Sequence, residues 1–244
     1  MRINLNSKNF IELNLCSNTK KDLVLVLPGG GYLYTSDREA EPVAIKFRNK
    51  GYHTGIYYYR ESLLLYPDVV LEAKEVIELL KKNDLVNRIF LIGFSAGGHL
   101  AGIMMTSFSQ DIKGTILAYP VVTSDPLYGH LGSFDNLLGH LRSDDLIQKA
   151  SIEKQVHQKV NPVFIMHTMD DQSVPVENTL VLIDALNKCH VPVEAHLYPF
   201  GRHGLSVVTK EVCFDDMEET DFINKYGYLA SWIDLAIDFI GRIK

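Results

Sequence analysis

One serine of the chain is flanked by glycines, in the run Gly93-Phe94-Ser95-Ala96-Gly97. An apolar segment precedes this run and a helical pattern follows it, the context in which G-x-S-x-G holds a serine hydroxyl above the edge of a sheet. Because Gly93 and Gly97 carry no side chain, neighbouring segments can pass close to such a sharp turn. The pattern predicts Ser95 as a nucleophile, and the alternative is a turn that serves only tight packing or phosphate binding.

A serine hydroxyl is a weak nucleophile until a base removes its proton, and an acid must hold that base in one tautomer. After a serine in this context, the acid and then the histidine are expected further along the chain. His203 is the predicted base, because two glycines flank it after the last expected strand. Asp171 is the predicted acid, because it follows an expected strand and begins a D-x-x-V-P turn. Asp170, beside it, and Asp125, after an earlier strand, are the alternative acids.

A second requirement is an oxyanion hole, because attack on a carbonyl places negative charge on its oxygen. Backbone N–H donors for that charge are expected in the residue after the nucleophile and in a loop after a central strand. We therefore predict an oxyanion hole formed by Gly30, Gly31 and Ala96. A phosphate-binding loop is the competing interpretation, but neither G-x-G-x-x-G nor G-x-x-x-x-G-K-[ST] occurs.

The other histidines fit the role of the base less well. His99 lies at a helix start, where we expect it to pack against a neighbouring strand, and His167 ends a strand and is expected to be structural. No H-x-x-x-H pattern and no cluster of cysteine and histidine indicates a metal site. We expect no cofactor.

Strands and helices alternate along most of the chain, which predicts an α/β fold with a mostly parallel sheet and helices on both faces. A hairpin of 2–5 and 10–15 is expected first. The further expected strands are 22–27, 53–59, 88–92, 115–118, 163–167 and 193–198. The expected helices are 36–51, 67–82, 97–107, 178–188 and 223–240. The first of these helices begins with a capping-box pattern, Ser36 followed by Glu39.

One segment interrupts the alternation, between the strands expected at 115–118 and 163–167. Within it, four apolar residues recur at helical spacing after Ser133, a candidate N-cap: Phe134, Leu137, Leu138 and Leu141. We expect residues 123–161 to form a short cap-like insertion over the carboxyl ends of the strands, where open α/β sheets bind ligands. No repeat or composition shift marks a boundary, so a single domain over residues 1–244 is predicted.

The composition argues against several partners. A formal net charge of −6, without clustered lysine and arginine, argues against nucleic acid and against an anionic membrane. No stretch approaches the roughly 20 apolar residues that span a bilayer, and residues 1–10 lack the apolar core of a secretory signal. The three cysteines are odd in number and far apart, which suits a reducing compartment. We expect a cytoplasmic protein whose partner is a small-molecule ester substrate, and homo-oligomerisation is left open.

These residues resemble the α/β-hydrolase superfamily, and most of all its bacterial esterase/lipase branch, with acetylesterases and xylan-associated acetyl esterases. The resemblance covers nearly the whole chain and rests on segments 27–32, 38–42, 58–60, 93–101, 167–175 and 201–204. It implies the α/β-hydrolase fold, the nucleophile, acid and base roles for Ser95, Asp171 and His203, and the glycine-loop role for Gly30 and Gly31. Many relatives have a histidine before these glycines where this chain has Pro28, which changes the support of the loop rather than its donors.

The expected function is that of a serine carboxylic-ester hydrolase that acts through an acyl-enzyme on short-chain esters. The resemblance adds O-acetylated sugars as substrates, and a short insertion favours small acyl groups because it covers the site less than a large lid. A serine peptidase or amidase is the second hypothesis, since the same triad cleaves amides, although exopeptidases of this fold usually carry a propeller or a large cap. A small-ligand binding protein without turnover is the third, and such a protein would usually have a damaged triad.

Overall fold

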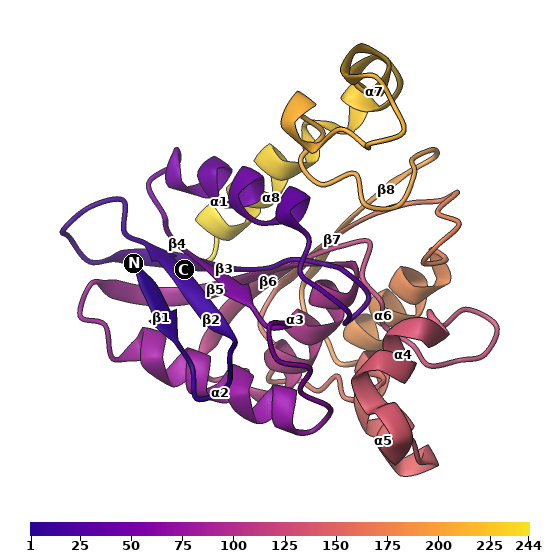
Figure 1. The fold of residues 1–244 in the computed structure, drawn as a ribbon, viewed down its shortest axis with the longest axis horizontal. Coiled ribbons are helices and arrows are strands. Elements are labelled where there is room, and N and C mark those ends of the chain that lie inside the picture. Colours follow the sequence, from indigo (N-terminus) through magenta and orange to yellow (C-terminus); the bar gives the residue numbers. More distant parts are fainter.

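The computed structural model describes residues 1–244, with every side chain except that of Leu141. Its centre is an eight-stranded sheet in the order β1-β2-β4-β3-β5-β6-β7-β8 (Figure 1). The strands are β1 (Arg2–Asn4), β2 (Phe10–Asn14), β3 (Lys21–Leu27), β4 (His53–Tyr58), β5 (Val86–Phe94), β6 (Ile112–Ala118), β7 (Val163–Thr168) and β8 (Val193–Tyr198). β2 pairs antiparallel with β1 and with β4, and the pairs from β4 to β8 are parallel. The prediction of a mostly parallel sheet is confirmed.

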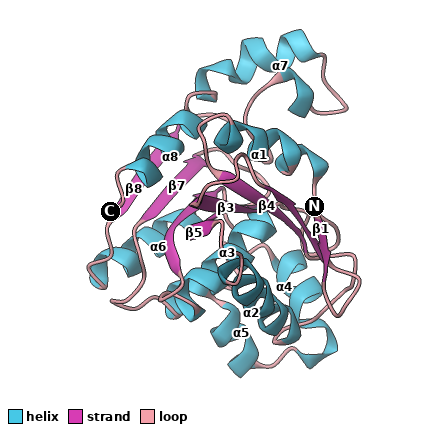
Figure 2. Cartoon of the chain, turned by 90° about the vertical axis from the view of Figure 1, so that its left-hand side faces the viewer, coloured by secondary structure: helices cyan, strands magenta, loops and turns pink.

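Helices cover both faces of this sheet (Figure 2). On one face lie α1 (Glu41–Arg48), α8 (Trp232–Gly241) and, beyond them, α7 (Glu219–Tyr226). On the other face lie α2 (Asp68–Lys81), α3 (Ser95–Ser107), α4 (Leu131–Leu138), α5 (Asp144–Ala150) and α6 (Glu177–Lys188). Of the helices described, none is long and apolar enough to cross a membrane.

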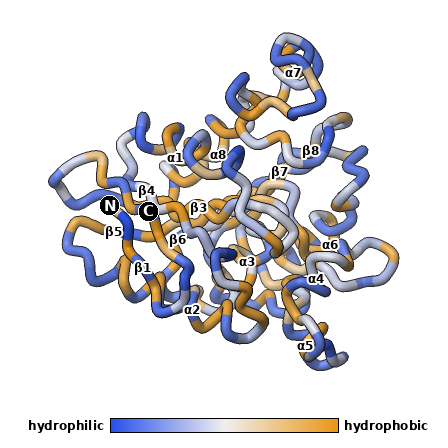
Figure 3. Tube along the Cα trace, viewed as in Figure 1, coloured by the Kyte–Doolittle hydropathy of each residue, from blue (hydrophilic) through white to orange (hydrophobic). Residues whose placement is uncertain are grey.

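The two faces explain why the central strands are apolar at every position. In β3, Leu23, Leu25 and Leu27 belong to the hydrophobic core under α2 and α3. Val24 and Val26 belong to the core under α1 and α8. Since successive side chains of a strand point to opposite faces, burial on both faces requires a continuous apolar run. Figure 3 shows this concentration of hydrophobic residues along the central strands, with hydrophilic segments at the periphery.

The expected capping box at Ser36 and Glu39 is wrong. The Ser36 side chain makes no capping hydrogen bond, a 3₁₀ turn occupies Asp37–Glu39, and α1 begins only at Glu41. The Glu39 carboxylate instead accepts hydrogen bonds in the interior, which makes it unavailable to a helix end.

The single helix expected over 223–240 is also wrong, because α7 and α8 are separated by a 3₁₀ turn at Gly227–Leu229. Phe222 at the start of this region packs edge-on against Phe214, whereas Trp232 packs against Phe94 of β5. Gly227 lies between these two residues, and glycine is a weak helix former at which the helix can be interrupted.

Residues 123–161 contain α4, α5 and two 3₁₀ turns, at Gly139–Leu141 and Ile152–Lys154. Ser133 is not the N-cap that was expected: α4 begins at Leu131, and the His130 side chain accepts a hydrogen bond from the Ser133 N–H. Leu141 falls in the first 3₁₀ turn, and its side chain lies outside the described part of the structure. The Asn136 amide donates to the Gly31 carbonyl at 2.8 Å, so this segment contacts the glycine-rich loop. The role of the segment as a cap and the single-domain assignment stay predictions.

His99 on α3 links that helix to the insertion rather than to a neighbouring strand as expected. Its ring is 1% exposed, its Nδ1 accepts from the Tyr32 hydroxyl at 2.8 Å, and its Nε2 donates to the Ala150 carbonyl at 2.7 Å. Burial lowers the pKa of His99 to about 4, so the imidazole is neutral near pH 7.

This buried neutral histidine should make the fold sensitive to acid. An imidazole in the unfolded chain has a pKa of about 6.5. Below that pH the unfolded state therefore takes up a proton that the folded state does not accept until about pH 4. We expect His99 to remove about 3 kcal/mol from the free energy of unfolding between about pH 7 and pH 4. Urea unfolding across this range should give a flatter pH profile for His99→Gln than for the wild type, and parallel profiles would contradict this assignment.

Candidate active site

Ser95 stands at a strained turn between β5 and α3, with φ at 51°. A non-glycine residue adopts this left-handed conformation only where the surroundings enforce it. A Cβ atom on Gly97 would lie 2.1 Å from the Leu27 carbonyl oxygen, and one on Gly93 would lie 2.4 Å from the Gly97 carbonyl oxygen. Both glycines of the motif are therefore required by close backbone approach, as the sequence indicates.

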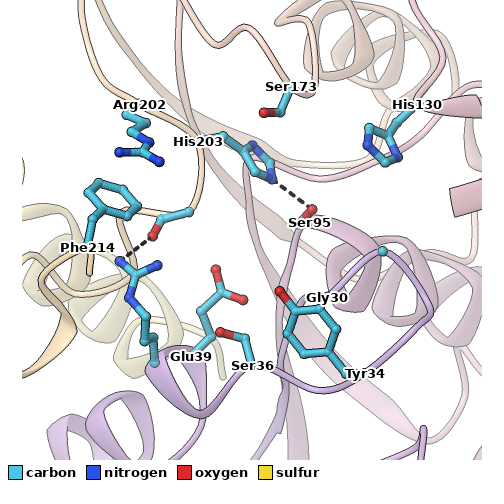
Figure 4. A pocket seen from close by; sticks show the side chains of 13 residues that line it. Gly30, Tyr34, Ser36, Glu39, Ser95, His130, Ser173, Arg202, His203 and Phe214 are labelled. Atoms are coloured by element: carbon cyan, nitrogen blue, oxygen red, sulfur yellow. Dashed lines mark hydrogen bonds between the residues drawn. The ribbon is translucent and has the colours of Figure 1, made fainter. Parts of the chain in front are cut away.

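The structure brings the three residues predicted for nucleophilic chemistry together at the carboxyl edge of the sheet. His203 Nε2 lies 2.8 Å from Ser95 Oγ (Figure 4), and His203 Nδ1 lies 2.6 Å from Asp171 Oδ2. The Asp171 side chain is fully buried, whereas the His203 side chain is 18% exposed. The serine end of this chain of hydrogen bonds is thus accessible and its acid end is sealed from water.

The Asp171 carboxylate is held in its charged form. Its Oδ1 accepts from the N–H groups of Ser173 at 2.8 Å and Val174 at 2.9 Å. Burial by itself would raise the pKa of Asp171, but hydrogen bonds from His167, His203 and the Val174 N–H outweigh it and hold the pKa well below its usual range. A charged Asp171 accepts the Nδ1 proton of His203, which leaves the Nε2 lone pair facing the Ser95 hydroxyl.

The two alternative acids have other partners. Asp170 Oδ1 accepts from the Gly201 N–H at 2.6 Å, which anchors the loop that carries His203. Asp125 Oδ1 accepts from the Leu127 N–H at 2.8 Å within its own loop. Of the three candidates, Asp171 is the one that the structure places against His203.

The glycine-rich loop lies beside Ser95. Gly30 and Gly31 have φ angles of 129° and 63°, and a Cβ on Gly30 would lie 2.2 Å from the Tyr34 carbonyl oxygen. Both glycines line the same cavity as Ser95. Ala96 is the second residue of α3, so its N–H has no partner within the helix. The predicted donors thus surround the nucleophile, and their role in binding an oxyanion stays a prediction.

Just before these glycines, Tyr59 holds the backbone at Pro28. The Tyr59 hydroxyl donates to the Pro28 carbonyl at 2.6 Å, and Tyr59 is fully buried. The loop is therefore supported through its backbone at Pro28.

Glu39 was not predicted as a site residue, but the structure places it between two loops of the site. Its buried carboxylate accepts from the Gly29 N–H at 2.7 Å and from the Tyr119 hydroxyl at 2.7 Å. The Tyr119 hydroxyl in turn accepts from the Ser206 N–H at 2.9 Å, and the Tyr119 ring packs edge-on against His203 with centroids 4.9 Å apart. One buried acid therefore connects the glycine-rich loop with the loop that carries the base.

Arg38, next to Glu39, also holds the loop of His203. Its guanidinium donates to the carbonyl oxygens of Gly204 and Val212 at 3.0 Å each. The guanidinium groups of Arg38 and Arg202 both lie over the Phe214 ring, at 4.3 Å and 4.2 Å from its centroid. The base thus sits on a loop with several polar and aromatic anchors.

The cavity above Ser95 has a volume of about 450 Å³. Its lining is Gly30, Gly31, Tyr34, Ser36, Arg38, Glu39, Ser95, His130, Ser173, Arg202, His203, Gly204 and Phe214. His130, from the insertion, was not expected in the site. Burial and the neighbouring His203 lower the pKa of His130, so its neutral ring adds a polar group to the cavity wall. Among the described residues, no group of three or more histidine, cysteine or acidic side chains could hold a metal ion.

Comparison with known proteins places this geometry among hydrolases. A family model described as the prolyl oligopeptidase family matches residues 66–227. An endo-1,4-beta-xylanase B of Butyrivibrio fibrisolvens is 32% identical over 80% of this chain and 34% of its own length. An acetylxylan esterase of Xylanibacter ruminicola is 28% identical over 80% of this chain and 43% of its own length. The chain thus spans less than half the length of these two relatives.

Among solved structures, an acetyl ester-xyloside bifunctional hydrolase from Caldicellulosiruptor lactoaceticus superposes with a TM-score of 0.82 at 31% identity. The match covers 97% of this chain and 89% of the other. The predicted α/β-hydrolase fold is therefore confirmed.

Asp171→Asn should strongly reduce the reactivity of Ser95 toward a fluorophosphonate. The asparagine amide would donate to His203 Nδ1 and favour the wrong tautomer, a change that costs about 10⁴-fold in a comparable triad. Asp170→Asn is the matched control, because it makes the same change one residue away, and it should slow labelling by less than about tenfold. The measurement is the second-order labelling rate, and equal losses in the two variants would contradict the assignment of Asp171.

Glu39→Ala should slow labelling by about 10- to 100-fold, because the Gly29 N–H and the Tyr119 hydroxyl would lose their buried partner. Glu39→Gln keeps an acceptor oxygen and should lose less. Glu41→Ala is the control, since Glu41 lies two residues away and is exposed. Labelling is compared at a temperature at which thermal unfolding curves show all variants folded, and a wild-type rate for Glu39→Ala would show that this carboxylate does not support the site.

Proposed function

We propose that this chain, which belongs to the prolyl oligopeptidase family of α/β-hydrolases, is a serine carboxylic-ester hydrolase. Its proposed substrates are short acyl esters, with O-acetylated sugars as the substrate class. One observation carries the proposal: Ser95 Oγ lies 2.8 Å from a histidine nitrogen whose partner nitrogen is held by a buried carboxylate. This is the geometry that activates a hydroxyl for attack on a carbonyl carbon.

The reaction follows from these positions. Ser95 Oγ bonds to the ester carbonyl carbon while His203 Nε2 takes the hydroxyl proton, and the carbonyl π electrons move to the oxygen. The N–H groups of Gly30, Gly31 and Ala96 stabilise that oxyanion. As the carbonyl re-forms, the bond to the leaving alcohol breaks and His203 donates its proton to the departing oxygen.

The acyl-enzyme is hydrolysed by the same groups in reverse roles. His203 removes a proton from water as the water oxygen attacks the acyl carbon. Collapse of the second tetrahedral intermediate breaks the bond to Ser95 Oγ, which regains its proton from His203. The products are a carboxylic acid and an alcohol, and the enzyme returns to its starting protonation state.

The lining of the cavity supports a small acyl group. Tyr34 and Phe214 are its large apolar side chains, and the other lining residues are glycines or carry polar groups. A long acyl chain gains about 0.8 kcal/mol for each CH₂ group only where apolar surface buries it. This cavity would leave most of such a chain without that gain.

The names of two similar proteins support a sugar ester as the substrate. One relative is an acetylxylan esterase, and one structural neighbour is a hydrolase for acetyl esters and xylosides. The polar groups around Ser95, among them Ser36, Ser173 and His130, suit an alcohol that carries several hydroxyls. We therefore assign acetylated xylose-based sugars as the first substrates to test.

The purified protein should hydrolyse p-nitrophenyl acetate with a kcat/KM at least about 100-fold above that for p-nitrophenyl palmitate. The reason is that the cavity offers too little apolar surface to bury a long acyl chain. p-Nitroacetanilide, the matched amide, tests a peptidase or amidase and should be cleaved far more slowly. Ser95→Ala should lose on the order of 10⁴-fold or more in kcat. Faster turnover of the palmitate ester or of the amide, or full activity in Ser95→Ala, would contradict the proposal.

A further inference from the structure

A second hollow adjoins the cavity of Ser95. It has a volume of about 430 Å³, and the two cavities share Ser173, Arg202 and His203 as lining residues. His203 therefore belongs to the rim between them, with Ser95 on one side. The hollow on the other side takes no part in the reaction described above.

The lining of this second hollow combines hydrogen-bonding groups with aromatic rings. Beyond the shared rim it consists of Asp170, Gln172, Phe200, Gly201, Lys225 and Tyr226. Phe200 lies three residues before His203 and is 67% exposed. Its exposed ring lines this hollow and is available to a ligand.

The backbone around Phe200 is firmly held. The Tyr228 hydroxyl donates to the Phe200 carbonyl, and the Gly201 N–H donates to Asp170 at 2.6 Å. The Gly201 carbonyl accepts from the Thr168 hydroxyl at 2.8 Å. The ring is therefore presented by a fixed turn between β8 and His203, and it would lose little backbone freedom on binding a ligand.

The charged side chains of the hollow each have a neighbour within the protein, and both signs of charge are present. Arg202 is paired with Asp216 at 2.7 Å, Asp170 accepts from the Gly201 N–H, and the Lys225 ammonium lies over the Tyr226 ring at 5.2 Å. A neutral ligand with several hydroxyls fits this lining better than an anion or a cation would.

The reaction places the leaving group next to this hollow. His203 must donate its proton to the oxygen of the departing alcohol, so the rest of that alcohol begins beside the His203 ring. A sugar offers hydroxyls to polar side chains and a C–H face to an aromatic ring. We propose that the second hollow binds the sugar units of an acylated oligosaccharide, with the exposed Phe200 ring stacked on one of them. This inference rests on the proposed function and adds to it an extended leaving-group site.

The test compares a substrate that reaches the second hollow with one that does not. kcat and KM are measured for O-acetylated xylotetraose and for p-nitrophenyl acetate. Phe200→Ala should lower kcat/KM for the oligosaccharide by about tenfold, mainly through KM, and should leave the value for p-nitrophenyl acetate within about twofold. Phe200→Tyr keeps an aromatic face and should retain wild-type values. Leu71→Ala is the control, because it truncates a side chain of similar exposure on α2 and should change neither substrate.

Any other result would overturn the sugar site, the sugar class of substrate or the esterase activity. Equal losses on both substrates would show that Phe200 only positions the loop of His203 and would overturn the sugar site. An unchanged KM for the oligosaccharide in Phe200→Ala would overturn the site while the wild-type turnover still supports the proposed function. A wild type that cleaves p-nitrophenyl acetate but not the acetylated oligosaccharide would overturn the sugar class and the site together. A wild type inactive on both would overturn the esterase itself.

Discussion

The hydrogen bond between Ser95 and His203 is the interaction on which the rest of the site depends. It joins residues 108 positions apart in the sequence at a distance of 2.8 Å. A parallel sheet makes this possible, because the carboxyl ends of β5, β7 and β8 meet at one edge and each is followed by one of the three residues. The strained turn at Ser95 then directs its hydroxyl toward the other loops. If either loop moved by an ångström or two, the hydroxyl would lose its base.

Two buried carboxylates hold these loops in position relative to one another. Asp171 holds the His203 ring, and Glu39 ties the Gly29 N–H to Tyr119, whose ring contacts His203. A buried donor that loses its acceptor is costly, so the N–H and O–H groups that donate to each carboxylate oppose its displacement. The loop that would bind the oxyanion and the loop that carries the base are therefore mechanically coupled through Glu39.

The strand–helix alternation and the three triad residues could be predicted because each rests on a local pattern. The apolar run of β3 indicates burial on both faces, and Ser95 is bracketed by the glycines that its turn requires. Glu39 was misassigned, because a glutamate three residues after a serine has the same local pattern whether it caps a helix or turns inward. The break between α7 and α8 was missed because Trp232 packs against Phe94 of β5, a contact between residues too far apart for any sequence window to contain. His130 could not be placed, because it lies within the insertion, well beyond the end of the strand expected at 115–118, where no local pattern predicts the path of the chain.

A crystal structure of the protein after reaction with a p-nitrophenyl phosphonate would test the assignment of the nucleophile and its surroundings most directly. Phosphorus should be bonded to Ser95 Oγ, and its unesterified oxygen should lie within about 3.2 Å of the backbone nitrogens of Ala96 and of Gly30 or Gly31. The reagent should be an alkyl p-nitrophenyl phosphonate, which loses p-nitrophenolate as the bond to Ser95 Oγ forms, and His203 Nε2 should face the alkoxy oxygen that remains. An adduct on another residue, or a phosphonate oxygen turned away from these nitrogens, would contradict the proposed activation of Ser95.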